Sequence, residues 1–264
     1  MTPRASALAI LRADPGLASL HRSLGLYYGD PARDAAMDAL YAGFLGPGAL
    51  AFDIGSHVGD RVGSFRRLGA RVVALEPQPL CARAIRALYG DDPGVTMVEA
   101  ACGDRPGRLA LHINSANPTI SSVSAAFIGA ANGARGWEAQ VWDAEIEVTC
   151  TTLDALIVQY GMPSFVKIDV EGFEDAVLAG LSQALPALSF EFTTIQRDIA
   201  YRCLDRLAAL GCYGFDISLR ESQRLTFGRW VSKDDMAAHV AALPHEANSG
   251  DVYCRVSGPA DPLP

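Results

Sequence analysis

The sequence predicts an α/β fold with a largely parallel sheet, on three observations. From residue 49 onward, short apolar segments alternate with segments of helical periodicity, as in chains built from strand–helix–strand units. The first apolar segment ends in Asp53 and runs into a turn that contains Gly55 and Gly59. The second ends in Glu76. Parallel strands joined by right-handed crossovers bring such strand ends to one edge of the sheet, where ligands bind.

Residues 1–48 form a predicted helical extension. Apolar side chains recur at helical spacing in residues 17–24 and 31–45, and the glycines and proline of 46–48 end the second segment. The apolar face of the second segment either packs on the core or forms a lid over a cofactor.

Residues 49–102 contain the most regular alternation. Each expected helix is followed by a glycine, a residue that commonly ends helices. We expect helices at 60–68 and 79–89 and strands at 49–54, 71–76 and 95–99.

The alternation breaks between residues 103 and 150. A turn at 103–107 leads to an extra strand at 108–113, and a further strand is expected at 145–150. Residues 114–143 are rich in small and polar side chains with isolated aromatic residues. They form either a mobile loop or an insertion that covers a substrate.

The regular pattern then resumes and continues to the last strand, which makes residues 49–264 one domain. Thr152 is placed to cap a helix, and glycines follow three of the expected helices. The expected helices are 153–160, 173–179 and 198–210, and the expected strands are 164–169, 188–192, 213–217 and 251–256.

Composition narrows the class of partner. The chain has 264 residues, half of them apolar, and a net charge of −8, which disfavours a nucleic-acid partner because phosphate binding needs clustered cations. No apolar run reaches the ~20 residues that cross a membrane. The six cysteines show no metal-binding spacing, which favours a reduced, cytoplasmic protein. A small-molecule acceptor and no membrane partner are expected, and the sequence is compatible with a homodimer.

The glycine spacing favours S-adenosylmethionine over NAD as the cofactor. A dinucleotide site requires G-x-G-x-x-G, whereas Gly55 and Gly59 are separated by three residues. An acid at Asp53 would repel a diphosphate and attract the ammonium group of S-adenosylmethionine. Glu76 is placed to accept hydrogen bonds from a ribose. The alternative is that Asp53 is a buried helix cap in an ordinary nucleotide-binding fold.

A second group of polar residues follows later strands. Lys167, Asp169 and Glu171 alternate at the end of one strand, and Glu191 lies near the end of the next. We favour Asp169 as a general base, with Lys167 keeping it ionised and the glutamates binding acceptor hydroxyls. A less favoured arrangement has the three acids binding Mg²⁺. Alternatively, Lys167 and Asp169 form a structural ion pair, and Glu171 and Glu174 stabilise the start of the next helix.

These motifs resemble those of FkbM-type methyltransferases. The similar segments are the Asp53–Gly59 turn, Leu75-Glu76-Pro77, residues 100–107, Thr152-Leu-Asp154 and Lys167–Glu174, and they cover roughly 49–195. The resemblance implies a class I methyltransferase fold: a seven-stranded, mostly parallel, Rossmann-like sheet with helices on both faces.

The resemblance also implies an activity and a set of site residues. The activity would be S-adenosylmethionine-dependent methylation of hydroxyls on sugars, polyketides or other secondary metabolites. Ser56 and His57 stand where the family usually has Ala-Asn, so His57 either contacts the cofactor, reaches the substrate or is structural. The resemblance implies Asp53, Gly55 and Gly59 in the cofactor loop, Glu76 at the ribose, and Lys167, Asp169 and Glu171 at the active-site rim. Together with the pattern of the residues themselves, this gives a set of expected cofactor residues: Asp53, Gly55, Ser56, His57, Gly59, Glu76, Pro77 and Asp169. The expected catalytic residues are Lys167, Asp169, Glu171 and Glu191.

Two other functions compete with this interpretation. An NAD-linked oxidoreductase would require the dinucleotide motif, and the chain has no tyrosine four residues before Lys167 or Lys233. A domain that binds the adenosyl cofactor without turnover is the second alternative. The presence of Lys167, Asp169, Glu171 and Glu191 together argues against it.

Overall fold

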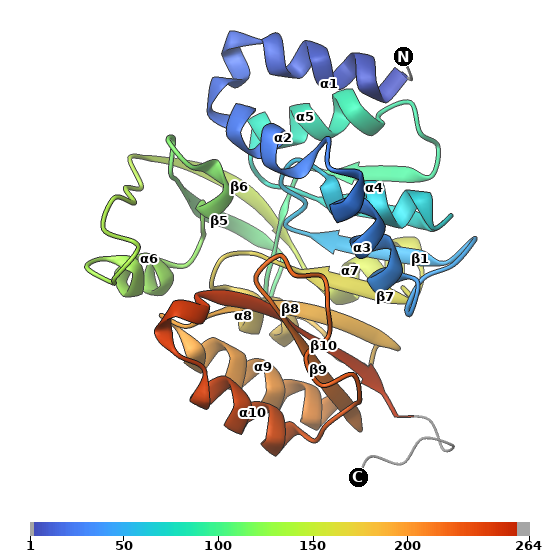
Figure 1. Ribbon diagram of the computed structural model, residues 1–264, viewed down its shortest axis with the longest axis vertical. Coiled ribbons are helices and arrows are strands. Elements are labelled where there is room, and N and C mark those ends of the chain that lie inside the picture. Colours follow the sequence, from blue (N-terminus) through green and yellow to red (C-terminus); the bar gives the residue numbers. More distant parts are fainter. Residues whose placement is uncertain (1–2, 258–264) are drawn as a thin grey trace.

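The computed structural model describes residues 3–257 and has a central seven-stranded sheet in the order β3-β2-β1-β7-β8-β10-β9 (Figure 1). Every strand is parallel to its neighbours except β10, which runs antiparallel between β8 and β9. The seven-stranded, mostly parallel sheet predicted above is therefore confirmed. The strands are β1 (Leu50–Ile54), β2 (Arg71–Leu75), β3 (Val95–Val98), β7 (Phe165–Ile168), β8 (Ala187–Thr193), β9 (Tyr213–Leu219) and β10 (Ser249–Val256).

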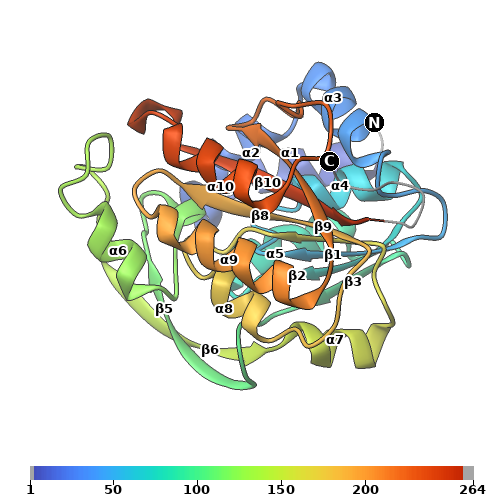
Figure 2. The ribbon, with the colours of Figure 1, turned by 90° about the horizontal axis from the view of Figure 1, so that it is seen from below.

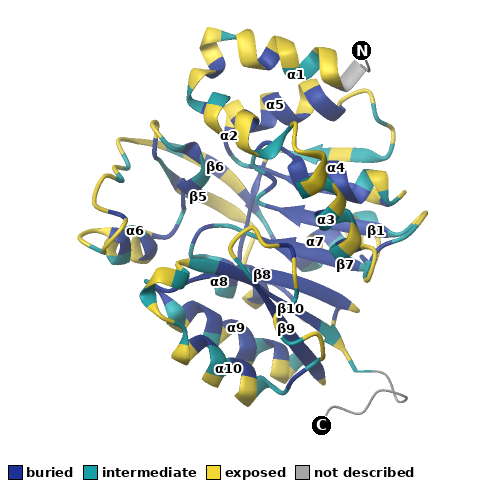
Figure 3. Cartoon of the chain, in the orientation of Figure 1, coloured by how far each residue is buried: buried dark blue, intermediate teal, exposed yellow. Residues whose placement is uncertain are grey.

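Helices cover both faces of this sheet, giving three layers (Figures 1 and 2). The inner strands between them are almost entirely buried, whereas the residues of the edge strand β3 are half-buried or exposed (Figure 3). One face carries α7 (Leu153–Tyr160), α8 (Glu174–Ala179), α9 (Arg197–Leu210) and α10 (Lys233–Ala242). The other carries α1 (Pro3–Ala13), α2 (His21–Tyr27), α3 (Pro31–Tyr41), α4 (Asp60–Arg67) and α5 (Pro79–Tyr89), with a 3₁₀ turn at Pro15–Leu20.

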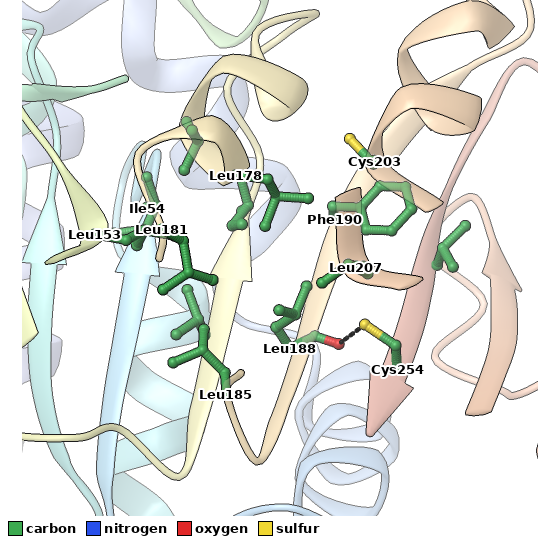
Figure 4. Packing of buried hydrophobic residues seen from close by; sticks show 14 of the residues in the cluster. Ile54, Leu153, Leu178, Leu181, Leu185, Leu188, Phe190, Cys203, Leu207 and Cys254 are labelled. Atoms are coloured by element: carbon green, nitrogen blue, oxygen red, sulfur yellow. Dashed lines mark hydrogen bonds between the residues drawn. The ribbon is translucent and has the colours of Figure 1, made fainter. Parts of the chain in front are cut away.

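The α7–α10 face contains the larger apolar core (Figure 4). Leu188 and Phe190 alternate along β8 and pack against Leu207 of α9, all fully buried. The thiol of Cys254 donates to the carbonyl oxygen of Leu188 at 3.4 Å, and burial raises its pKa. All six cysteines are free and Cys212 alone is exposed, so the buried thiols are packing groups.

The N-terminal helices belong to the opposite core. Met37 and Tyr41 of α3 are fully buried, and the Tyr41 ring lies 5.5 Å, centroid to centroid, from the ring of Phe165 in β7. The apolar face of this segment therefore packs on the sheet, the first of the two roles considered for it. Within residues 3–257, no helix is long and apolar enough to cross a membrane.

Residues 101–151 form an arm beside the main sheet (Figure 1). Its strands are β4 (Ala101–Cys102), β5 (Gly107–Ile113) and β6 (Ala144–Thr151), in the order β4-β6-β5. Residues 114–143, which the sequence analysis left without regular structure, contain a 3₁₀ turn (Pro118–Ile120) and helix α6 (Ala125–Ala131). Phe127 and Trp137 pack edge to face at 5.4 Å and give the arm a small core of its own.

The strand register places several polar residues at one edge of the main sheet. Asp53 of β1 pairs with Ala74 of β2 on one side and with Lys167 of β7 on the other. The strand order changes direction at β1, because the chain proceeds to β2 and β3 on one side and to β7 and β8 on the other. Ligands of open α/β sheets bind beyond the carboxyl ends of the strands at such a switch point.

Candidate functional site

A cavity with about 800 Å³ of empty space lies beyond the carboxyl ends of β1, β2 and β7. Gly55 and Glu76 follow β1 and β2 directly, and Asp169 follows β7. Four of the predicted cofactor residues besides Asp169 line this cavity, namely Gly55, His57, Glu76 and Pro77. The arm contributes apolar lining from Leu111 and Val123.

Glu76 is held in one orientation by backbone donors. The N–H of His57 donates to one carboxylate oxygen at 2.8 Å, and the N–H of Gln78 donates to the other at 2.8 Å. Burial raises the pKa of Glu76 to about 8, although both N–H groups oppose that shift. A fixed carboxylate in a cavity wall is well suited to accept hydrogen bonds from the two hydroxyls of a ribose.

His57 forms a neutral part of the cavity wall. Its backbone has a left-handed φ of 47°, and burial lowers the pKa of its ring to about 4. One ring nitrogen lies 3.7 Å from the thiol of Cys81 and the other lies 3.4 Å from the hydroxyl of Thr119. The ring lines the cavity and is fixed on both sides, which favours a packing and hydrogen-bonding role at neutral pH over proton transfer.

The two glycines of the first turn each leave room for a different neighbouring residue. At Gly55, with φ of 84°, a Cβ would overlap the carbonyl oxygen of Asp169, so only glycine permits the close approach of the two strand ends. Gly59 precedes α4 and does not line the cavity. A Cβ there would lie 2.9 Å from the ring of Tyr89, so this glycine accommodates α5.

Asp53 and Ser56 lie beneath the cavity and do not line it. The Ser56 hydroxyl donates to the backbone carbonyl of Asp53 at 2.8 Å. Burial raises the pKa of Asp53 to about 7, opposed by Lys167, and one carboxylate oxygen has no hydrogen-bond partner among the described residues. Glu76 therefore lines the cavity and Asp53 does not, although the sequence analysis assigns both to the cofactor.

Lys167 links two acids at the centre of the sheet. Its ammonium donates to Asp169 and to Asp251 of β10, each at 2.9 Å, and the side chain is buried. Burial disfavours the ammonium, but the two carboxylates raise the pKa of Lys167 well above its usual value. Burial likewise opposes ionisation of Asp169, and Lys167 overcomes it and lowers the pKa of Asp169. Both charged forms therefore persist at neutral pH.

A second cavity, with about 880 Å³ of empty space, adjoins the first. Asp169, Glu171 and Glu191 line both cavities, and a carboxylate oxygen from each lies within 4.8 Å of the others. Burial and the neighbouring Asp169 raise the pKa of Glu171 and of Glu191. Three of the four predicted catalytic residues are thus brought together at the boundary between the cavities, with Lys167 beneath them.

Glu174 has the helix-stabilising role considered for it. One of its oxygens accepts from the N–H of Val170 at 2.9 Å, and the other accepts from Gly172 at 3.1 Å, at the start of α8. Glu171 does not share this role.

An ionic network that the sequence analysis did not identify attaches the β9–α10 connection to the site. Glu221 pairs with Arg33 of α3 at 2.9 Å and with Arg61 of α4 at 3.1 Å, and Arg33 also pairs with Asp60 at 2.7 Å. The Tyr27 ring lies against Arg33 at 4.9 Å and lines both cavities. Asp60 and Arg61 directly follow the glycine turn, but Tyr27, Arg33 and Glu221 stand far from it in sequence and outside recognisable motifs. The sequence therefore offered no signal for the network.

Asp251 was also missed, although a signal existed. It begins the final expected strand, and an acid is unusual within such an apolar segment. In the structure it pairs with Glu191 of β8, at the end of the strand that lies nearest the site. Asp251 can be assigned to the site only when it is known that β10 lies beside β8 and not at the edge of the sheet.

The fold and the cavity at its switch point define a Rossmann-like α/β protein with a ligand site beyond the strand ends. The model of the methyltransferase FkbM domain family matches residues 53–215, more than half of the chain. The chain belongs to this family and is an S-adenosylmethionine-dependent methyltransferase. The NAD-linked oxidoreductase considered above is thereby excluded.

Solved structures of similar shape have little sequence in common with this chain. An O-methyltransferase from Bacillus cereus in complex with SAH is 11% identical, with 97% of this chain and 93% of that chain covered and a TM-score of 0.47. A TehB-like SAM-dependent methyltransferase from Corynebacterium glutamicum is 11% identical, with coverages of 92% and 97% and a TM-score of 0.47. A precorrin-6y C5,15-methyltransferase from Geobacter metallireducens is 15% identical, with coverages of 88% and 90% and a TM-score of 0.42. No curated protein matches the chain.

The different positions of Glu76 and Asp53 lead to a prediction about cofactor affinity. We expect Glu76→Ala to weaken binding of S-adenosylhomocysteine by about 1–3 kcal/mol, because it removes a buried, pre-oriented acceptor. Asp53→Ala should weaken binding less, since its carboxylate does not line the cavity. Calorimetric titration of both variants checks this order. A larger loss for Asp53→Ala would show that the cofactor contacts Asp53 in preference to Glu76.

Proposed function

We propose that this methyltransferase transfers the methyl group of S-adenosylmethionine to a hydroxyl of a small molecule. The observation that carries the proposal is that Asp169 lines both cavities, with Glu76 on the far side of the first. The cofactor would occupy the first cavity with its ribose at Glu76 and its methionine portion toward Asp169. The acceptor would occupy the second, where Trp137 and Tyr27 supply aromatic surface.

The chemistry requires that the acceptor oxygen, the methyl carbon and the sulfur be aligned. Methyl transfer is a displacement at carbon, and fixing the two reactants in line supplies much of the rate enhancement. An alcohol is a poor nucleophile until its proton is being removed, so a base must lie within about 3 Å of it. Asp169 is ionised, stands between the cavities and fits that role.

The surrounding residues support this assignment. Lys167 keeps Asp169 ionised and fixes its orientation through the 2.9 Å hydrogen bond. Glu171 and Glu191 present further carboxylate oxygens to the second cavity and would accept hydrogen bonds from neighbouring acceptor hydroxyls. A polyhydroxylated acceptor, such as a sugar or a polyketide, would use all three acids.

The function is tested by incubating the protein with methyl-labelled S-adenosylmethionine and pools of small molecules that carry hydroxyl, amino or carbon nucleophiles. Mass spectrometry of the labelled products identifies the methylated atom. Label on a hydroxyl oxygen of a small molecule supports the proposal. Label confined to nitrogen, carbon or RNA would contradict it while leaving the methyltransferase class intact.

We further propose that residues 114–143 and the end of α2 close over the acceptor. Thr119, Ile120 and Trp137 of the arm line the second cavity together with Tyr27. Closure would exclude water from the reacting groups. Hydrogen exchange of residues 114–143 should be slower with S-adenosylhomocysteine and acceptor than in the free protein, whereas exchange in α9 should not change. Full protection of residues 114–143 in the free protein would contradict a closing motion.

A further inference from the structure

The carboxylates of Asp169, Glu171 and Glu191 converge on one point at the boundary of the two cavities. One oxygen from each lies within 4.8 Å of the others. They come from three places in the fold: the residue after β7, the turn that follows it, and the end of strand β8, where Glu191 lies. Three carboxylates this close repel one another when ionised, so either protons or a cation must lie among them.

The cations of the site pair with Asp169 and with acids outside the cluster, and with neither glutamate. Lys167 lies below the cluster and divides its ammonium between Asp169 and Asp251. Arg61, in the wall of the second cavity, pairs with Asp60 and Glu221. Within residues 3–257, no lysine, arginine or histidine forms an ion pair with Glu171 or with Glu191.

Glu171 points to a ligand independently of its neighbours. The residue is 8% exposed, and its carboxylate accepts no hydrogen bond from any residue in the described part of the chain. Its backbone carbonyl, by contrast, accepts a hydrogen bond from the Ser122 hydroxyl at 2.6 Å. A buried carboxylate without a partner is costly, and this one lines both cavities. A bound cation would supply the partner that this carboxylate lacks.

We propose that Asp169, Glu171 and Glu191 bind a hard divalent cation such as Mg²⁺ or Mn²⁺. Carboxylate oxygens are the donors that these ions prefer, and the cluster contains no nitrogen or sulfur donor. Two glutamates without ion-pair partners also match a double positive charge better than one ammonium group. This inference rests on the proposed function for its role: a cation here would hold the acceptor oxygen beside the methyl group and favour loss of its proton.

The test is a titration of Mn²⁺ into the full-length protein after treatment with EDTA, followed by the paramagnetic signal of free Mn²⁺, with and without S-adenosylhomocysteine. We expect one saturable site and displacement of Mn²⁺ by excess Mg²⁺. Glu171→Gln and Glu191→Gln should each weaken binding by 10-fold or more. Glu221→Gln is the matched control, because Glu221 lines the same cavities but is already paired with arginines, and it should change affinity by less than 3-fold.

The outcomes separate this inference from the proposed function. Binding of S-adenosylhomocysteine without saturable Mn²⁺ binding overturns the cation site and leaves the methyltransferase proposal standing. Equal loss of Mn²⁺ affinity in all three glutamine variants also overturns it, because general charge would then explain the binding. Thermal melting of each variant verifies that it is folded. If hydroxyl methylation is absent, the proposed function fails, and the titration still decides whether the cluster binds a cation.

Discussion

Asp169→Asn should lower the rate of methyl transfer by about 10²-fold or more, while the affinity for S-adenosylhomocysteine changes little. The asparagine keeps the size of the side chain and removes its ability to accept a proton or to bind a cation strongly. Lys167 would retain its ion pair with Asp251, so the variant should remain folded. Single-turnover kinetics with labelled cofactor measure the rate, and calorimetry measures the affinity.

Asp175→Asn is a suitable control for this substitution. Asp175 lies in α8, six residues beyond Asp169, and pairs with Arg202 at the surface. We expect its turnover to equal that of the unchanged protein. Normal turnover of Asp169→Asn would contradict both the base and the cation site, since each assigns the reactive carboxylate to this residue.

Of the substitutions proposed here, Lys167→Met should lower the free energy of unfolding the most. The ammonium is buried and compensates two buried carboxylates. Removing one partner of a buried ion pair typically costs about 3–5 kcal/mol, because the remaining charge is left uncompensated. Denaturant unfolding at pH 7.5 measures the loss in the free energy of unfolding.

The effect of Lys167→Met should depend on pH in a defined direction. Without the ammonium, burial raises the pKa values of Asp169 and Asp251 above those of the unfolded chain. The folded variant then binds more protons than the unfolded one, so its stability increases as the pH falls from neutrality toward the ordinary carboxyl range. The deficit relative to the unchanged protein should be smaller at pH 5.5 than at pH 7.5.

Lys233 is the other lysine of the chain and provides the control. It pairs with Asp205 at 2.7 Å on the surface, with 38% of its side chain exposed, so Lys233→Met should lower the free energy of unfolding far less than Lys167→Met. Adding Asp251→Asn to Lys167→Met should recover part of the lost stability. Equal effects of the two lysine substitutions would contradict the central role of Lys167 in the sheet.

The sheet could be predicted because its signals are local. Each strand of the main sheet is a short apolar run, and glycines follow most of the helices between them, so alternation alone identified the α/β class. Helix α6 was not identified because its seven residues are mostly alanine and glycine, which carry little periodicity. It is stabilised by a serine cap and by the burial of Phe127 against Trp137, a contact between residues ten positions apart.

The site could be predicted only where its residues follow strands. Glu76 and Asp169 are strand-end residues, and the parallel register brings them to one edge. Asp53 has the same pattern in sequence, but its side chain projects to the face of the sheet that also carries Lys167, beneath the cavity. Side-chain direction at a strand end depends on where the turn begins, and no sequence pattern specifies that to within one residue.

The position of β10 determines when the site can exist during synthesis. Asp251 reaches Lys167 only after the last strand has entered the gap between β8 and β9, although every other member of the cluster precedes it by at least sixty positions along the chain. A nascent chain that has emerged only as far as β9 has the cofactor loop and the three acids. Its Lys167, however, lacks one of its two carboxylate partners, Asp251. The arrangement around Lys167 is therefore complete only after β10 has been synthesised and has docked between β8 and β9.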